Sequence, residues 1–168
     1  MKFTSQYLSL CFSVTLFAAG ACADTIKLPE KSPSVSIDVP DAWKGDETDK
    51  GFVCESPDSE ATVIFEVTNA KGLDGLIEEN IEWLAEQKVT IDKSTQLSKE
   101  FKAAGMDWSV VSWDGKNEEY GAASIKFAFV DIGKGKVLMI TYWVTKKGES
   151  KHADKLIKIF DSVKKLRA

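Results

Sequence analysis

The chain contains a single histidine, His152, and any serine or cysteine nucleophile would have to use it as its base. No G-x-S-x-G turn accompanies this histidine, and no cysteine lies in a catalytic setting. A protonated histidine is also disfavoured near the N-terminus of a helix. We predict that His152 is a solvated surface residue near the first turn of the last helix, and that the chain has no catalytic residue.

The cysteines, the single histidine and the carboxylates form no known metal-binding motif. Neither C-x-x-C nor H-E-x-x-H occurs in the chain, so the sequence predicts no zinc site. Four carboxylates crowd one predicted loop near Trp43: Asp41, Asp46, Glu47 and Asp49. Carboxylates are ligands that calcium prefers, but their order does not match the D-x-[DN]-x-[DN]-G calcium loop. We interpret them as a solvated loop and predict that the chain binds no metal and no cofactor.

The N-terminus has the layout of a secretory signal peptide. No charged side chain occurs in residues 3–23, Lys2 precedes this stretch, and a small-residue A-x-A site ends at Ala23. We predict that residues 1–23 are removed. Two alternatives remain open: an uncleaved anchor, since about 20 apolar residues can span a bilayer, or a lipoprotein lipidated at Cys22. Membrane association is expected only in those two cases.

Cleavage at this site would leave a mature chain that begins at Asp24 and keeps one cysteine, Cys54. A single cysteine cannot form an intrachain disulfide, even in an oxidising compartment. Free cysteine behaves as a small apolar residue, and Cys54 shares a strand face with Phe52. We predict that Cys54 is buried, and an intermolecular disulfide is the alternative.

The chain has 168 residues, of which 43% are hydrophobic and 29% charged, and this composition is typical of one globular domain. We place that domain at residues 35–167, after a short segment at 24–34. Period-two alternation predicts strands at 35–39, 51–56, 61–68, 106–114, 122–132 and 136–145, with a weaker pattern at 95–101. Period-3.6 patterns predict helices at 73–87 and 151–166. Short turns favour antiparallel pairing, so the fold class is α+β: a mostly antiparallel β-sheet of about six strands covered by two main helices.

Two apolar patterns are specific enough to place side chains within these elements. Residues 138–144 are apolar on both faces, which predicts a strand in the middle of the sheet. The last helix carries an apolar arc that we expect to face the core: Ala153, Leu156, Ile157, Phe160 and Val163.

Two of the five tryptophans are candidates for binding a partner, because exposed tryptophan often anchors an interface. Trp43 lies in the acidic loop, and Trp83 lies near the edge of the apolar stripe of the first helix. Packing in the fold is the alternative for both, since large aromatic side chains are rarely buried completely.

The charged side chains are distributed unevenly along the chain. Residues 24–92 carry 17 acidic and 6 basic side chains, whereas residues 93–168 carry 9 acidic and 15 basic ones. The two parts can balance each other within one sheet, or the second can present a basic face to an anionic partner. Three lysines on the polar side of the last helix are the candidates for such a face: Lys155, Lys158 and Lys165.

Several stretches carry a resemblance to a known family. They are the strand and turn Ser36–Trp43 (SIDVPDAW), the mid-chain helix, the paired long strands and the closing segment Ile159–Lys164 (IFDSVK). With them, residues 33–166 resemble the PsbP-like superfamily, which includes a lumenal extrinsic subunit of photosystem II, a nuclear Ran-binding import factor and many exported bacterial domains. These motifs mark the fold, so the resemblance implies an architecture and a binding role, and no functional residue is carried over.

The net charge of −4 excludes a general nucleic-acid binder, because such domains are strongly basic. We expect an exported protein, periplasmic or secreted, that is monomeric and not an enzyme. Its expected role is to bind an unknown protein partner in the envelope or to assist an assembly there. The alternative is a hydrolase that uses carboxylates or a divalent ion.

Overall fold

The structure is a computed structural model and describes residues 23–166. In chain order its elements are β1 (Ala23–Leu28), β2 (Val35–Pro40), β3 (Lys44–Thr48), β4 (Gly51–Glu55), β5 (Ala61–Asn69), α1 (Leu73–Glu86), β6 (Val89–Ile91), the 3-10 helix η1 (Lys93–Thr95), β7 (Leu97–Ala103), β8 (Met106–Asn117), β9 (Gly121–Gly133), β10 (Lys136–Thr145), α2 (Lys146–Asp161) and β11 (Lys164–Lys165). Most of the predicted signal peptide and Cys22 lie outside the described residues. Neither helix of the described part is long and apolar enough to cross a lipid bilayer.

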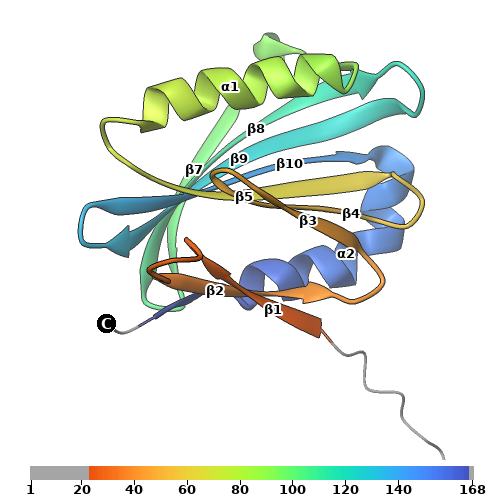
Figure 1. The fold of residues 1–168 in the computed structure, drawn as a ribbon. Coiled ribbons are helices and arrows are strands. Elements are labelled where there is room, and N and C mark those ends of the chain that lie inside the picture. The colour runs from red at the N-terminus through yellow and green to blue at the C-terminus, as the bar shows by residue number, and fades with distance from the viewer. Residues whose placement is uncertain (1–22, 167–168) are drawn as a thin grey trace, which may run out of the picture.

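The strands form two sheets, and the helices lie on opposite faces of the larger one (Figure 1). The large sheet has eight strands in the order β3-β4-β5-β10-β9-β8-β6, with β7 also paired to β8. α1 covers one face, whereas α2 and the three-stranded sheet β1-β2-β11 lie on the other (Figure 1). Every strand pair is antiparallel. The α+β class is confirmed, and the structure has more strands than the six or so that we expected.

The additional strands carry little apolar signal of their own. β3 contains Lys44, Gly45, Asp46, Glu47 and Thr48, all of them exposed, and it pairs with β4 through the backbone. A strand without apolar residues has no period-two pattern, so the prediction of a loop here was wrong. β1 begins at Ala23, the last residue of the predicted signal peptide, and continues into the segment 24–34 that we expected to precede the domain. It pairs with β2 over its whole length.

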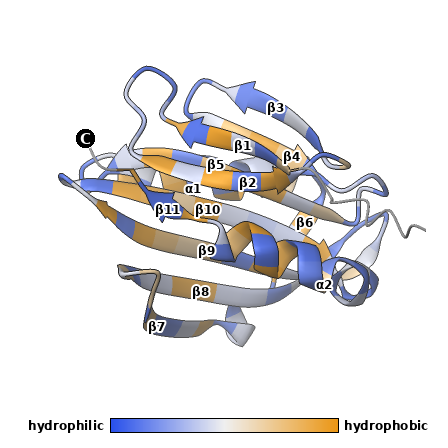
Figure 2. Cartoon of the chain, turned by 90° about the horizontal axis from the view of Figure 1, so that it is seen from below, coloured by the Kyte–Doolittle hydropathy of each residue, from blue (hydrophilic) through white to orange (hydrophobic). Residues whose placement is uncertain are grey.

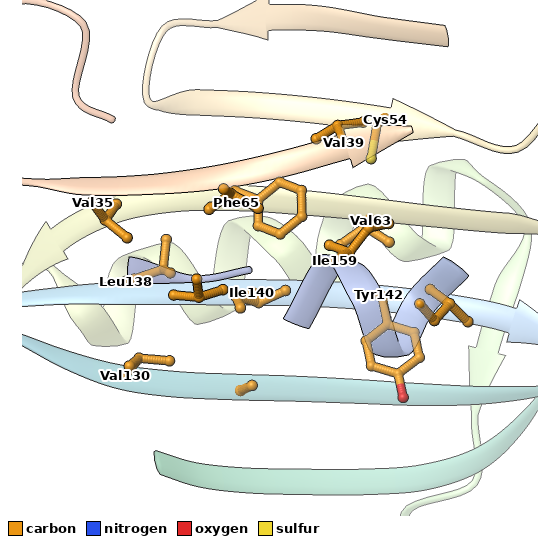
Figure 3. Packing of buried hydrophobic residues seen from close by; sticks show 14 of the residues in the cluster. Val35, Val39, Cys54, Val63, Phe65, Val130, Leu138, Ile140, Tyr142 and Ile159 are labelled. Carbon is orange, nitrogen blue, oxygen red and sulfur yellow. The ribbon is translucent and has the colours of Figure 1, made fainter. Parts of the chain in front are cut away.

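β10 lies in the middle of the large sheet, between β5 and β9, as its two apolar faces predicted. Leu138 and Ile140 point into a cluster that includes Ile159 of α2 and Val35 of β2 (Figure 3). Met139 points into a second cluster, which contains the buried leucines of α1, Leu76 and Leu84. The sheet therefore has a packed core on each face.

Cys54 of β4 lies in the first of these clusters with none of its surface exposed. Burial raises the pKa of its thiol to about 12, because a thiolate is poorly solvated in an apolar interior. The prediction of a buried cysteine is confirmed, and the intermolecular disulfide is disfavoured because the sulfur is inaccessible.

The last helix differs from the prediction at both ends. α2 begins at Lys146, where the Oγ1 atom of Thr145 caps it by accepting a hydrogen bond from the backbone N–H of Gly148 at 2.8 Å. It ends at Asp161, so Val163 is buried beyond the helix. The first residues of α2 are mostly polar, so they have no apolar periodicity that would predict the first turn of the helix.

The buried face of α2 is also rotated relative to the predicted arc. Leu156 is buried as expected, but Ala153 and Ile157 are exposed, with 56% of Ile157 accessible to solvent. The buried face instead begins with Gly148 and His152. A glycine is needed there because a Cβ atom at Gly148 would lie 2.7 Å from the carbonyl oxygen of Glu60.

Candidate binding groove

The histidine lies in a buried polar cluster rather than on the surface. His152 is only 2% exposed, and its Nε2 atom lies 2.9 Å and 3.2 Å from the two carboxylate oxygens of Asp58. Asp58 also accepts a hydrogen bond from Ser56 Oγ at 2.7 Å and pairs with Lys151. The prediction of a solvated histidine was wrong, because its partner is 94 residues away and has no local signature.

This cluster holds α2 against the turn between β4 and β5. Partial burial opposes ionisation of Asp58, but hydrogen bonds from Lys151, Ser56 and His152 hold the pKa of its carboxyl well below its usual range. An ionised carboxylate can only accept, so Nε2 of His152 is the nitrogen that donates. Its Nδ1 atom is buried and has no hydrogen-bond partner among residues 23–166. Within residues 23–166, no three His, Cys, Asp or Glu side chains are placed to hold a metal ion.

The two candidate tryptophans lie in different environments. Trp43 is 4% exposed, and its ring meets that of His152 edge-on with centroids 5.7 Å apart. It is a core residue and offers almost no surface to a partner. Trp83 of α1 is half-buried and lines a hollow of about 200 Å³ together with Glu79 and Asn80.

The three candidate lysines do not share one helix face. Lys158 is exposed and Lys155 is half-buried on α2, but Lys165 lies in β11, which pairs with β2. The side chain of Lys165 fills the space beside Gly133 in the turn between β9 and β10. The predicted lysine face was therefore wrong for Lys165, because α2 ends four residues earlier.

A groove of about 560 Å³ opens on the α2 side of the large sheet, and we call it the α2-face groove. Its lining comes from β7, β8, β9, β10 and α2, and includes Leu97, Lys99, Phe101, Val110, Lys126 and Phe160. It exists because α2 contacts β9 and β10, whereas β7 and β8 extend beyond it at the margin of the sheet (Figure 2). The apolar side chains of β7 consequently lack a cover, with Leu97 71% exposed and Phe101 39% exposed.

Strand register explains how the lining residues come together. Leu97, Ser112, Lys126 and Tyr142 lie opposite one another across β7, β8, β9 and β10. Lys99 lies one pleat further along β7, opposite Val110 of β8. Alternation along each strand places these side chains on the same face of the sheet.

The groove is apolar and carries positive charge. The Nζ atom of Lys99 lies 5.6 Å from the ring centroid of Phe101, and Nζ of Lys126 lies 5.4 Å from that of Tyr142. No carboxylate is among the lining residues. Burial also raises the pKa of the Tyr142 hydroxyl, which stays neutral at ordinary pH. Such a site suits a ligand with apolar and anionic groups.

A second hollow, of about 570 Å³, lies on the α1 side of the same region of the sheet. Leu73 and Phe129 contribute apolar surface to it, but three carboxylates and one lysine also line it: Glu100, Asp107, Asp131 and Lys102. The two faces of this margin therefore differ in charge. The sequence pattern of β7 was the weakest that we interpreted as a strand, which is why these lining residues were not among the candidates.

Comparisons with known proteins show which solved structures have a similar fold. No protein-family model matches the chain, and no curated protein matches its sequence. The solved structure of cyanobacterial PsbP (CyanoP) from Synechocystis is similar, with a TM-score of 0.60 and 7% identity over 95% of this chain and 99% of that one. LpqN, described as involved in cell envelope biogenesis of Mycobacterium tuberculosis, has a TM-score of 0.53 and 12% identity over 86% of this chain and 91% of LpqN. These similarities show that the chain has a PsbP-like fold, which confirms the resemblance at the level of architecture.

Proposed function

We propose that this chain, with its PsbP-like fold, is an exported, non-catalytic domain that binds a protein partner in the cell envelope through the α2-face groove. The observation that carries the proposal is the exposure of Leu97 and Phe101 on one uncovered margin of an otherwise packed sheet. Exposed apolar side chains that gather around a groove mark interaction sites more often than singly scattered ones do.

Export is supported by the signal-peptide pattern of residues 1–23. LpqN, which has the same architecture, is described as taking part in cell envelope biogenesis, and a role in the envelope would agree with that description. The hydrolase alternative has less support. The histidine is buried against Asp58, and the carboxylates that line the hollow on the α1 side are not placed to hold a metal ion within residues 23–166.

Photo-crosslinking in the parent organism tests this function. A photoreactive phenylalanine analogue replaces Leu97 in the groove, and the matched control carries it at Glu47 on β3, an exposed residue on the opposite edge of the sheet. We expect a covalent adduct with one envelope protein from position 97 and none from position 47. Equal adducts from both positions, no adduct from position 97, or an adduct with a second copy of this chain would contradict the proposal.

A further inference from the structure

The two edges of the large sheet differ in a way that points to the form of the partner. At one edge, β3 presents only polar and charged side chains and a glycine. At the other, β7 pairs with β8 alone among the described strands and presents Leu97 and Phe101. An unpaired edge with exposed apolar side chains is a template for another strand, and charged edges are how proteins prevent such pairing. β3 is protected in this way and β7 only in part.

β7 is also regular along its length and is held in place by its pairing with β8, so its free edge can pair with another strand. Its seven residues pair with β8 in one continuous register, from Leu97 opposite Ser112 to Ala103 opposite Met106. The hairpin closes through Ala104 and Gly105, whose φ angles of 51° and 74° are those of a tight turn. At about 3.4 Å per residue, β7 offers roughly 20 Å of free edge, enough for a bound segment of six or so residues.

The side chains of β7 that face the groove determine which residues are favoured in a strand added beside β7. Leu97, Lys99 and Phe101 lie on the groove side in this order. Directly opposite side chains on neighbouring strands contact each other, so apolar residues are favoured beside Leu97 and Phe101, and an acidic residue beside Lys99. Lys126 supplies a second cation in the groove, and no carboxylate lines it to compete.

We propose that the partner is bound as an extended, acidic segment that adds a strand to the free edge of β7. Its groove-facing residues alternate as apolar, acidic and apolar, and its backbone pairs with the outward amides and carbonyls of β7. This inference rests on the proposed function, because it specifies the chemistry of the protein partner that binds in the α2-face groove.

The probe is a synthetic peptide, Thr-Ile-Thr-Glu-Thr-Ile-Thr, with both ends blocked. Its isoleucines and glutamate share one face of a strand, and a second peptide with lysine in place of glutamate is the charge control. Titration of the mature chain, followed by NMR chemical shifts, measures both affinities. We expect the lysine peptide to bind at least about tenfold more weakly. Equal affinities, or no shift with either peptide at the limit of solubility, would overturn the inference.

Amide hydrogen exchange tests the strand pairing itself. The backbone N–H groups of β7 that do not bond to β8 should exchange at least about tenfold more slowly with the glutamate peptide bound, because pairing protects them from water. Unchanged exchange along β7 in the peptide complex would overturn strand addition, even if the peptide binds elsewhere in the groove.

A charge reversal in the protein completes the design. Lys99→Glu should invert the preference, so that the lysine peptide binds more tightly than the glutamate peptide. Lys44→Glu, at an exposed position on β3, should leave the preference as in the wild type. Thermal unfolding checks that both variants are folded. An unchanged preference in folded Lys99→Glu would overturn the inference. If crosslinking at position 97 captures an envelope protein but the peptides fail, the function stands and only strand addition falls.

Discussion

Replacing Asp58 with alanine should lower the free energy of unfolding by about 3 kcal/mol, because the buried ring of His152 loses the carboxylate that is its hydrogen-bond partner in the described part of the chain. Hydrogen bonds that involve a charged group contribute about 1.5–3 kcal/mol each, and Asp58 accepts them from His152 and from Ser56. The pair with Lys151 adds little, because 55% of the lysine side chain is exposed.

Urea unfolding of residues 24–168 at neutral pH, followed by tryptophan fluorescence, measures this loss. Lys151→Ala is the matched control, since it removes only the exposed partner of the same carboxylate, and it should cost less than about 1 kcal/mol. If Asp58→Ala lowers the free energy of unfolding by less than about 1 kcal/mol, or by no more than Lys151→Ala does, the Asp58–His152 contact does not stabilise the fold as we infer.

The same pair predicts the pH dependence of stability. The pKa of the Asp58 carboxyl is lower in the folded protein than its ordinary value of 3.8. As the pH falls toward that value, the carboxyl binds a proton in the unfolded chain while it stays ionised in the folded protein. Its contribution is complete above about pH 5 and is lost as the pH falls further. As the pH falls below about 5, the stability difference between the wild type and Asp58→Ala should therefore shrink. A difference that grows as the pH falls below about 5 would show that the sign is wrong.

Four further predictions concern other parts of the chain. Ile159→Ala should cost about 2–5 kcal/mol in urea unfolding because Ile159 is fully buried, whereas Ile157→Ala on the exposed side of α2 should change stability by less than about 0.5 kcal/mol. Cys54 should not react with a thiol reagent at pH 8 until the protein is unfolded, because its sulfur is buried and protonated. Thr145→Ala should cost about 1 kcal/mol, since it removes the side-chain cap of α2. Intact-mass analysis of the native protein should show a chain that begins at Asp24; a mass that retains residues 1–23, or a lipidated N-terminal cysteine, would support the alternatives.

The sequence predicted the elements that have strong apolar periodicity. β2, β5, α1, β8, β9 and β10 lie within a few residues of the predicted ranges, because each of them buries a regularly spaced apolar face. The central position of β10 followed from side chains that are apolar on both faces, as in residues 138–144. These signals are local in the sequence, and they are reliable because a strand or helix that packs on the core needs apolar residues at regular spacing.

The predictions failed where partners are distant in the sequence. His152 is polar and lies in a lysine-rich run, and its partner Asp58 lies 94 residues earlier in the sequence. Trp43 follows an exposed turn, yet its ring packs against that same histidine. Neither contact leaves a periodic pattern, so local reasoning placed His152 in solvent and left Trp43 open between packing in the fold and binding a partner.

The groove was missed for a related reason. Phe160 belongs to the predicted apolar arc, but it is only half-buried and lines the α2-face groove, so its replacement by alanine should cost less than that of a fully buried phenylalanine. An apolar residue at a binding surface has the same pattern as one in the core. Only the position of α2 relative to β7 and β8 distinguishes the two.

The most direct test of the central claim is the dissociation constant of the protein captured by crosslinking at position 97, measured for two variants. Leu97→Asp places a charge in the α2-face groove, and Ile157→Asp places one at an exposed apolar residue outside its lining. If the groove is the binding surface, Leu97→Asp should weaken binding at least about tenfold while Ile157→Asp leaves it unchanged. Equal effects of the two substitutions, or undiminished binding by Leu97→Asp, would contradict the claim.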